Sequence, residues 1–238
     1  MKKIMILVFL MMIIQKIDAQ EFHFGFQAAP TLGWFKPDYN ESIGGANFSI
    51  KSSGSKIGFM YGLIMDFGFT PNYAVSTGAN IAYRTGSLDY TTTLNTNSIL
   101  YTRKYSLEYV EIPVLLKLKT NEIGYIKYYG QVGLSLGVNI RGRAEVDSTV
   151  SHPLYYTQGS QSNVNVMSDI NPITMSMVIG AGIEYSLQGH TQLMLGLTFN
   201  NGFMDILKDK NMELNSNTYA LKYSSITNYL ALNVGIFF

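Results

Sequence analysis

Residues 57–84 read IGFMYGLIMDFGFTPNYAVSTGANIAYR, and their alternation of large apolar with small or polar residues decides the fold class. A period of two places successive side chains on opposite faces of a β-strand. The proline of Thr70-Pro71-Asn72 pre-sets the backbone angle of a tight turn between the two halves. The stretch therefore predicts a hairpin whose two strands each have one apolar face.

The same unit recurs twice along the chain. Residues 105–139 form a second predicted hairpin around a turn at 120–124, and residues 173–203 form a third around Gln188-Gly189-His190. Two further strand-like segments stand alone, FHFGFQAAPTLGW at 22–34 and ITNYLALNVGIFF at 226–238. Three hairpins and two single segments give eight strands.

Short and long connections alternate between these strands. The long ones span residues 36–56, 85–104, 141–172 and 204–224, and their Ser, Asn, Thr, Gly and charged residues predict solvated loops. Within the last, FMDILKDKNMEL predicts a short helix or a solvated excursion. This alternation over an even number of strands is typical of an outer-membrane barrel. The predicted class is an all-β, eight-stranded antiparallel transmembrane β-barrel with short periplasmic turns and long extracellular loops.

The first twenty residues, MKKIMILVFLMMIIQKIDAQ, have the pattern of a secretory signal peptide. Lys2 and Lys3 precede an apolar run at 4–14, and the small residue Ala19 follows. The run is shorter than the roughly 20 residues that a membrane-spanning helix needs. We expect cleavage after Ala19, which gives a signal peptide at 1–19, a barrel domain at 20–238, and export to the bacterial outer membrane.

Charge and cysteine content exclude several classes of partner. Removal of residues 1–19 takes away three lysines and one aspartate, so 17 basic and 16 acidic residues become 14 and 15. A nearly neutral chain has no field for binding nucleic acid. Because there is no cysteine, disulfide scaffolds and thiolate metal sites are excluded.

A soluble eight-stranded barrel such as a lipocalin is the alternative fold. Its apolar faces would point inward around a ligand, and its polar faces would point outward. Only 14% of the residues are charged, whereas soluble surfaces run to roughly 25–35%. The composition favours the membrane barrel.

The polar faces of the predicted strands carry six charges that would point into the lumen, since Lys or Arg at the lipid midplane costs about 2–4 kcal/mol. These are Asp66, Arg84, Glu111, Lys117, Lys127 and Glu184. Charges of both signs in an interior that side chains can just fill imply ion pairing. A structural plug is favoured over a conducting path, because a lining of one sign would have indicated ion selectivity.

The segment EYVEIPVLLKLK at 108–119 carries two of these charges and a proline. Alternate residues from Val110 to Leu118 predict a lipid-facing row. Leu107 and Tyr109 are equally compatible with lipid but have the opposite parity, which predicts a β-bulge between Tyr109 and Glu111. Pro113 has no N–H, so it should interrupt one hydrogen bond of the ladder.

The final strand ends on an aromatic residue, and one of its faces is apolar. This pattern resembles the C-terminal signal that the barrel-assembly machinery of Gram-negative bacteria reads during insertion. The residues of this face are Leu230, Leu232, Val234, Ile236 and Phe238.

No pattern of catalytic, cofactor-binding or metal-binding residues stands out. The three histidines, His23, His152 and His190, lie far apart in the sequence and show no nucleophile with an orienting partner. The acidic residues of the long connections lack the spacing of a calcium loop. The sequence therefore predicts a barrel that is not an enzyme and has no cofactor.

Residues 105–140, YSLEYVEIPVLLKLKTNEIGYIKYYGQVGLSLGVNI, resemble the small outer-membrane barrels of Bacteroidota grouped as PorT-like or outer membrane protein beta-barrel domain proteins. The segments LEYVEIPVLLK, NEIGY and YYGQVGL carry the resemblance. It implies a barrel in contact with outer-membrane lipid, and for the family's namesake an association with type IX secretion. The function expected is a scaffold or interaction protein of the cell envelope, with envelope or secretion proteins as partners. The alternatives are a narrow pore for small solutes and a barrel enzyme acting on lipid or peptide.

Overall fold

Eight antiparallel strands close into a ring in the computed structural model, which describes residues 22–43, 46–94, 97–152, 155–187, 191–214, 217–221 and 224–238. The ring strands are β1 (Phe22–Pro37), β4 (Lys56–Thr70), β5 (Tyr73–Leu94), β6 (Asn97–Lys119), β7 (Ile126–His152), β9 (Ile173–Ser186), β10 (Gln192–Gly202) and β13 (Ser225–Phe237). Neighbours in the ring follow chain order, and β13 pairs with β1 to close it. The predicted eight-stranded barrel is confirmed. The predicted signal peptide and the turn at 188–190 lie outside the described residues.

Period-two alternation sets the two surfaces of the wall. On β6 the outward residues Ile112, Val114, Leu116 and Leu118 are 41–56% exposed, whereas Lys117 between them is completely buried. No helix in the described part of the chain is long and apolar enough to cross a membrane. This alternation of exposure shows that the apolar residues form an outer belt and that polar residues such as Lys117 point into the lumen.

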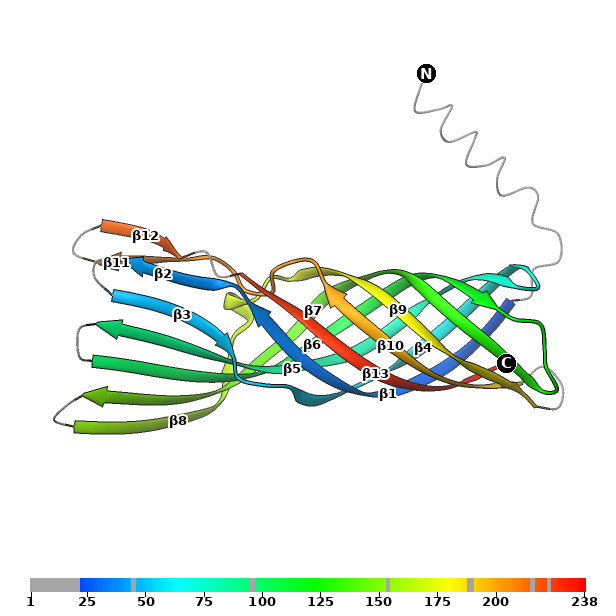
Figure 1. Cartoon of the computed structure of the whole chain (residues 1–238), viewed down its shortest axis with the longest axis horizontal. Coiled ribbons are helices and arrows are strands. Elements are labelled where there is room, and N and C mark those ends of the chain that lie inside the picture. The colour runs from blue at the N-terminus through cyan, green and yellow to red at the C-terminus, as the bar shows by residue number, and fades with distance from the viewer. Residues whose placement is uncertain are drawn as a thin grey trace, which may run out of the picture.

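The long connections are built mainly of strands and not of the predicted solvated loops. β5, β6 and β7 run for 22, 23 and 27 residues and extend far beyond the ring. The added strands are β2 (Tyr39–Ile43), β3 (Ala46–Ser52), β8 (Tyr155–Asn165), β11 (Lys210–Leu214) and β12 (Asn217–Leu221), with a short 3-10 turn at Met167–Asp169. Figure 1 shows these hairpins projecting together from one end of the barrel, while the C-terminus lies at the other end.

The segment FMDILKDKNMEL does not form the predicted helix. Its second half is strand β11, which pairs with β12. In its first half Ile206 and Leu207 are buried, and Leu207 forms an isolated bridge with Ile170. The segment thus forms one strand of a hairpin in its second half, and its first half contributes Ile206 and Leu207 to the interior above the barrel.

An apolar cap fills the interior of the projecting end. Its residues come from β1, β3, β5, β6 and β7 and from the segments at 166–170 and 206–207. They are Phe35, Ile50, Leu88, Tyr105, Leu107, Tyr109, Ala144, Val166, Ile170, Ile206 and Leu207. The cap is a hydrophobic core that sits directly over the polar lumen.

The bulge predicted between Tyr109 and Glu111 is wrong. Leu107 and Tyr109 are fully buried on the same inner face as Glu111, so β6 keeps its parity. These two residues face the apolar cap and not the lipid. An apolar side chain is compatible with either face of the wall, so the sequence did not indicate which face Leu107 and Tyr109 would occupy.

A register shift occurs nearby, between Glu108 and Tyr109 in the pairing with β7. The extra residue is Ile140, on β7, because Glu108 pairs with Arg141 and Tyr109 with Asn139. The side-chain amide of Asn139 donates to the carbonyl oxygens of Glu108 and Arg141, at 3.2 Å each. The bulge changes the inward parity of β7 from odd to even residues and so brings Ala144 into the cap.

Pro113 interrupts the ladder between β5 and β6, as its missing N–H predicts. The paired register stops at Thr77 with Val114 and resumes at Asn80 with Glu111. The hydroxyl of Thr77 donates to the carbonyl of Pro113 at 2.7 Å, which satisfies one group in the gap. Pairing with β7 continues through Pro113 and Ser135, so the wall stays closed on that side.

Truncation of the buried Leu107 tests the apolar cap. Leu107→Ala should destabilise the barrel by about 2–5 kcal/mol, because the cavity left in a packed core cannot be refilled. Unfolding by urea in lipid vesicles measures the change. Val114→Ala on the lipid face is the matched control and should change stability much less, since lipid chains fill the space. Equal effects of the two variants would show that the cap is not a packed core.

Candidate functional site: two charged layers in the lumen

The first charged layer joins three strands across the lumen. Lys117 and Lys119 lie two residues apart on β6 and so face the same side, toward Asp66 of β4 and Glu184 of β9. The Lys117 ammonium is 2.7 Å from Asp66 Oδ2 and 2.5 Å from Glu184 Oε1. The Lys119 ammonium is 3.2 Å from Asp66 Oδ2 and 3.0 Å from Glu184 Oε2. Each carboxylate therefore contacts both ammonium groups, and we call these four residues the lower ionic layer.

Aromatic rings enclose the lower ionic layer. The Lys117 ammonium lies 4.4 Å from the centre of the Tyr129 ring and 4.9 Å from that of Phe237. Ring faces attract cations, and rings also exclude water from the pairs. The layer therefore combines two negative and two positive charges in a nearly dry setting, where each ion pair is strong but each unpaired charge is costly.

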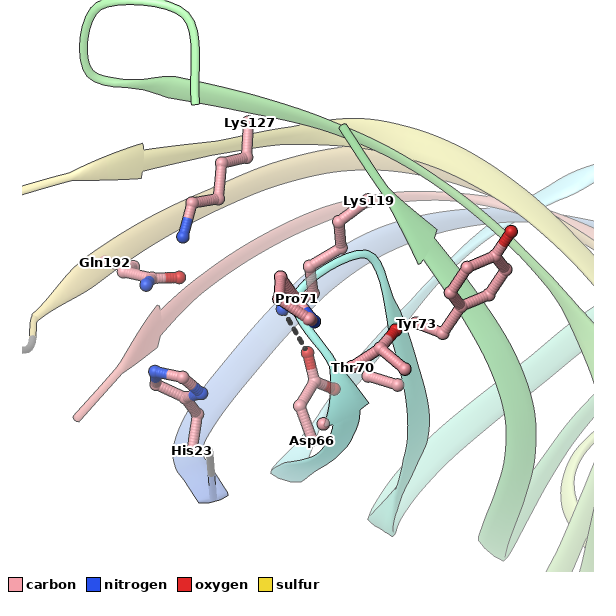
Figure 2. Close-up of a pocket in the computed structure, with 10 residues that line it drawn as sticks. His23, Asp66, Thr70, Pro71, Tyr73, Lys119, Lys127 and Gln192 are labelled. Atoms are coloured by element: carbon pink, nitrogen blue, oxygen red, sulfur yellow. Dashed lines mark ion pairs between the residues drawn. The ribbon is translucent and has the colours of Figure 1, made fainter. Parts of the chain in front are cut away.

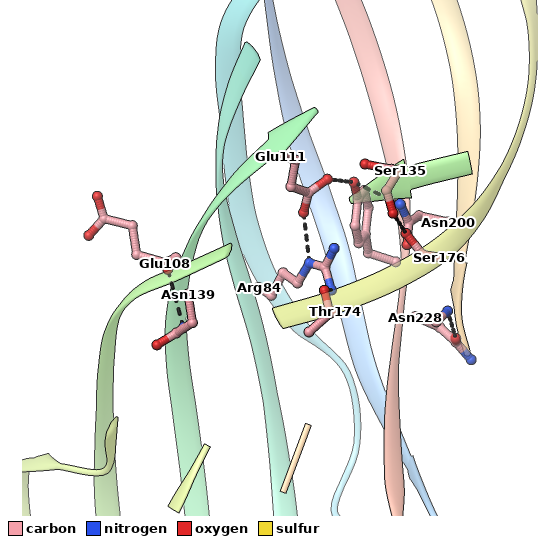
Figure 3. A network of polar contacts seen from close by, with 11 residues as sticks. Arg84, Glu108, Glu111, Ser135, Asn139, Thr174, Ser176, Asn200 and Asn228 are labelled. Atoms are coloured by element: carbon pink, nitrogen blue, oxygen red, sulfur yellow. Dashed lines mark hydrogen bonds and ion pairs between the residues drawn. The ribbon is translucent and has the colours of Figure 1, made fainter. Parts of the chain in front are cut away.

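The second charged layer lies closer to the apolar cap and centres on Glu111 (Figure 3). The carboxylate accepts from Arg84 Nε at 2.7 Å and from the Tyr229 hydroxyl at 2.8 Å. Arg84 Nη1 also donates to the Thr174 hydroxyl at 3.2 Å, and the guanidinium lies 4.6 Å from the centre of the Tyr109 ring. We call Arg84, Glu111, Thr174 and Tyr229 the upper ionic layer. Its charges cancel within one pair.

A cavity of about 40 Å³, lined by both polar and apolar residues, lies in the lumen beside Glu111 and Tyr229. Gln27, Asn80 and Gln131 are among its lining residues, and the Gln27 amide donates to Asn80 Oδ1 at 2.9 Å. A volume of this size holds only a few water molecules. This cavity is therefore far too small to form a path for solutes by itself.

The structure places five of the six charges predicted for the lumen in these layers, and Lys127 elsewhere. Lys127 lies at the periplasmic mouth, 3.8 Å from Glu122, and its side chain is 24% exposed. Figure 2 shows it beside a small pocket of about 20 Å³ that His23, Asp66, Lys119 and Gln192 also line. Lys119, and not Lys127, is the second ammonium group of the lower ionic layer. The inward parity that Lys119 shares with Lys117 can be seen in the sequence, but its height beside Asp66 and Glu184 cannot.

The residues predicted as a C-terminal assembly signal lie on the outer face of β13. Leu230, Leu232, Val234 and Phe238 are 42–53% exposed, while Ile236 is half-buried. Of the histidines, His23 lies at the mouth described above. The side chain of His152 and all of His190 are outside the described residues.

Comparison with family models gives a match to the outer membrane protein beta-barrel domain over residues 18–208. The chain belongs to that family. Its location is therefore the bacterial outer membrane, with the short turns on the periplasmic side and the projecting hairpins on the extracellular side. A comparison with curated proteins found no match.

Several solved outer-membrane barrels resemble this family member at low identity. Neisserial surface protein A is 11% identical, with a TM-score of 0.46 over 92% of this chain and 98% of that one. OprG of Pseudomonas aeruginosa is 12% identical, with a TM-score of 0.40 over 94% and 97%. The outer membrane protease OmpT of Escherichia coli is 8% identical, with a TM-score of 0.38 over 94% and 99%.

Replacement of Lys117 tests the lower ionic layer. Lys117→Met leaves two carboxylates with one ammonium group, and an uncompensated buried charge costs about 3–5 kcal/mol. Urea unfolding should show that loss. The double variant Lys117→Met with Glu184→Gln keeps the neutral pair of Lys119 and Asp66 and should recover most of it.

Lys127→Met is the matched control for this experiment. Its ammonium group is partly exposed at the mouth, so its loss should change stability by no more than about 0.5 kcal/mol. If Lys117→Met were as mild as Lys127→Met, the lower layer would have to be hydrated and its ion pairs unimportant.

Proposed function

We propose that this barrel is a non-enzymatic scaffold or interaction protein of the cell envelope whose lumen does not conduct. The single observation that supports this role is the stacking of three fillings along one narrow lumen: the lower ionic layer, the upper ionic layer and the apolar cap. An eight-stranded interior is just wide enough for side chains. What the protein does must then depend on its outer surfaces.

The projecting hairpins support the interaction role. Residues of β8 from Thr157 to Ser162 are all exposed, and β8 pairs on one side only, with β7. Function in barrels usually resides in the segments that a rigid scaffold presents. The hairpins are long, paired and anchored on the apolar cap, so they present extended β-sheet surfaces to a partner.

Finer assignments of origin, export and partners also belong to this proposal. The resemblance of residues 105–140 to PorT-like barrels of Bacteroidota supports a link to type IX secretion. The chain would be exported with cleavage of the signal peptide after Ala19. The barrel-assembly machinery would then insert it by recognising the C-terminal face. Partners would be envelope or secretion proteins.

A narrow pore for small solutes is the second candidate, because cavities lie in the lumen and at its periplasmic mouth. Planar-bilayer recordings separate it from the scaffold. The purified barrel should show no discrete openings, since both ionic layers and the cap would have to move. Openings that vanish in Lys117→Met or Glu111→Gln, but persist in the outward-facing Glu108→Gln, would establish that the lumen conducts. They would refute the interpretation of the two ionic layers as a structural plug.

The interaction role is tested by shortening one hairpin. Residues 147–160 can be replaced by an Asn-Gly turn that joins Val146 to Gln161, because these two residues are paired. The shortened barrel should insert normally but lose the envelope proteins that co-purify with the full chain. The matched control replaces residues 91–100 in the same way, between the paired Tyr90 and Tyr101, and should lose a different set or none.

A deletion strain complemented with either barrel adds the link to secretion. Loss of secreted surface proteins, restored by the full chain and not by the shortened one, supports the type IX role. Normal secretion in the deletion strain would refute it. Unchanged co-purification with both shortened barrels would refute the hairpins as the interaction surface.

A further inference from the structure

A groove of about 400 Å³ crosses β4, β5, β6, β7 and β8 near the base of the projecting hairpins. Lys56, Thr85, Lys104, Arg143, Glu145 and Asn163 are among its lining residues. Lys104 alternates with the buried Tyr105, and Arg143 and Glu145 flank the buried Ala144. The side chains of Lys104, Arg143 and Glu145 therefore lie on the outer face of the wall, away from both ionic layers and the cap.

The groove begins where the apolar belt ends. On β4 the outward apolar row ends at Ile57, which is 81% exposed, and the exposed Lys56 begins the strand with the opposite parity. On β5, Thr85 is the next outward residue after Tyr83, and the Thr85 hydroxyl donates to the Lys56 carbonyl at 3.1 Å. The apolar row of β4 thus ends at the groove, and the outward row of β5 becomes polar there.

The other two wall strands change at the same level. On β6 the outward row is apolar from Leu118 to Val110 and becomes polar at Glu108. The stretch of nine residues from Val110 to Leu118 rises roughly 20 Å along the barrel axis at the usual strand tilt. This height is close to the ~25 Å apolar band of membrane barrels. On β7 the exposed Ile140 is followed by Arg141 and Arg143. The groove therefore lies at the level of the lipid headgroups of the outer leaflet.

The charges in the groove are divided into paired and unpaired groups. Lys104 lies 3.0 Å from Asp147 Oδ2 and 3.9 Å from Glu145 Oε2. Hydrogen bonds from Ser160 and Lys104 lower the pKa of Asp147, so this carboxylate stays ionised and holds Lys104. Among the described residues, neither Lys56 nor Arg143 takes part in an ion pair. These two cations remain available to an anion.

Arg143 is also held in place. Its Nη1 donates to the carbonyl oxygen of Asn163 at 3.2 Å. Asn163 has a positive φ of 59° and lies where the register between β7 and β8 shifts, opposite Glu145. One guanidinium nitrogen is thereby fixed, and the remaining N–H groups keep the fork geometry that matches the oxygens of a phosphate.

We propose that this groove binds a phosphate group on the headgroup of an outer-leaflet lipid, with Arg143 and Lys56 as the anion-binding side chains. The lipid is the occupant because the groove is continuous with the apolar belt. A lipid whose chains lie against Ile57 and Ile140 brings its headgroup to the groove. Basic pockets at the edge of the bilayer recognise lipid headgroups in this way.

The full chain, folded in detergent, tests the site with two probes. These are a bisphosphorylated glycolipid (lipid A) and the same glycolipid after its phosphates have been removed. Lipid retained after size exclusion is quantified by mass spectrometry. The phosphorylated probe should be retained and the dephosphorylated probe largely lost. Equal retention of both probes would overturn the proposal, because it would reflect the apolar belt alone.

Substitutions assign the binding to named residues. Each surface cation near a membrane contributes about 1 kcal/mol, so Arg143→Gln and Lys56→Gln should each weaken binding about fivefold and the double variant about 25-fold. Lys51→Gln, an exposed cation of β3 outside the groove, is the matched control and should bind normally. Glu145→Gln should bind more tightly, since it removes the opposing charge.

Two further readouts keep the result specific. The folded fraction of each variant, read from its heat-modifiable mobility on a gel, must equal that of the wild type for a loss of binding to count. Inorganic phosphate should compete only weakly with the lipid. Strong competition by free phosphate would overturn the lipid assignment, and unchanged binding by the double variant would overturn the site.

Discussion

Backbone hydrogen bonding inside a closed ring is the constraint on which the rest of this structure depends. In hydrocarbon an unpaired N–H or C=O group costs several kcal/mol, so a spanning sheet can have no free edge. The pairing of β1 with β13 removes both edges. Closure with only eight strands then leaves an interior of one side-chain layer, and every inward residue must find its contacts there.

The interior and exterior exchange character along the same strands. Within the membrane the outside is apolar and the inside carries the two ionic layers. Above it the outside carries Lys104 and Arg143, while the inside carries the apolar cap. The exchange on β6 occurs at Glu108 and Tyr109, next to the Ile140 bulge of β7. The same barrel is therefore apolar outside and polar inside within the membrane, and polar outside and apolar inside beyond it.

Parity explains how much of this the sequence could predict. Strict alternation in residues 57–84 was enough for the strands and for placing Asp66 and Arg84 inside, because a charge facing lipid is costly. Leu107 and Tyr109 could not be placed, since an apolar side chain is compatible with either face and the sequence does not state where the lipid ends. The choice between Lys119 and Lys127 needed the height of each residue along the lumen, which depends on strand tilt and register.

The projecting strands escaped prediction for a related reason. Segments such as Thr91 to Thr93 and Thr157 to Gln161 lack apolar alternation, and their polar composition is that of a loop. They are strands because β5, β6 and β7 stay paired with one another beyond the membrane, and β8 adds to the projecting part of β7. Strand structure is inherited there from the barrel and is not encoded locally.

The origin of the paired charges has a consequence for assembly. Asp66, Lys117 and Glu184 lie on β4, β6 and β9, so their ion pairs join strands that belong to different periplasmic turns. Arg84 and Glu111 lie on β5 and β6, which share a projecting hairpin but no periplasmic turn. No pair of strands joined by one periplasmic turn therefore contains either ion-paired set complete. A hairpin that crossed the bilayer alone would carry bare charge into hydrocarbon, whereas hairpins that enter together meet their counterions on arrival. The lumen thereby couples insertion to ring closure, because a partly assembled barrel would leave charges in the membrane without their counterions.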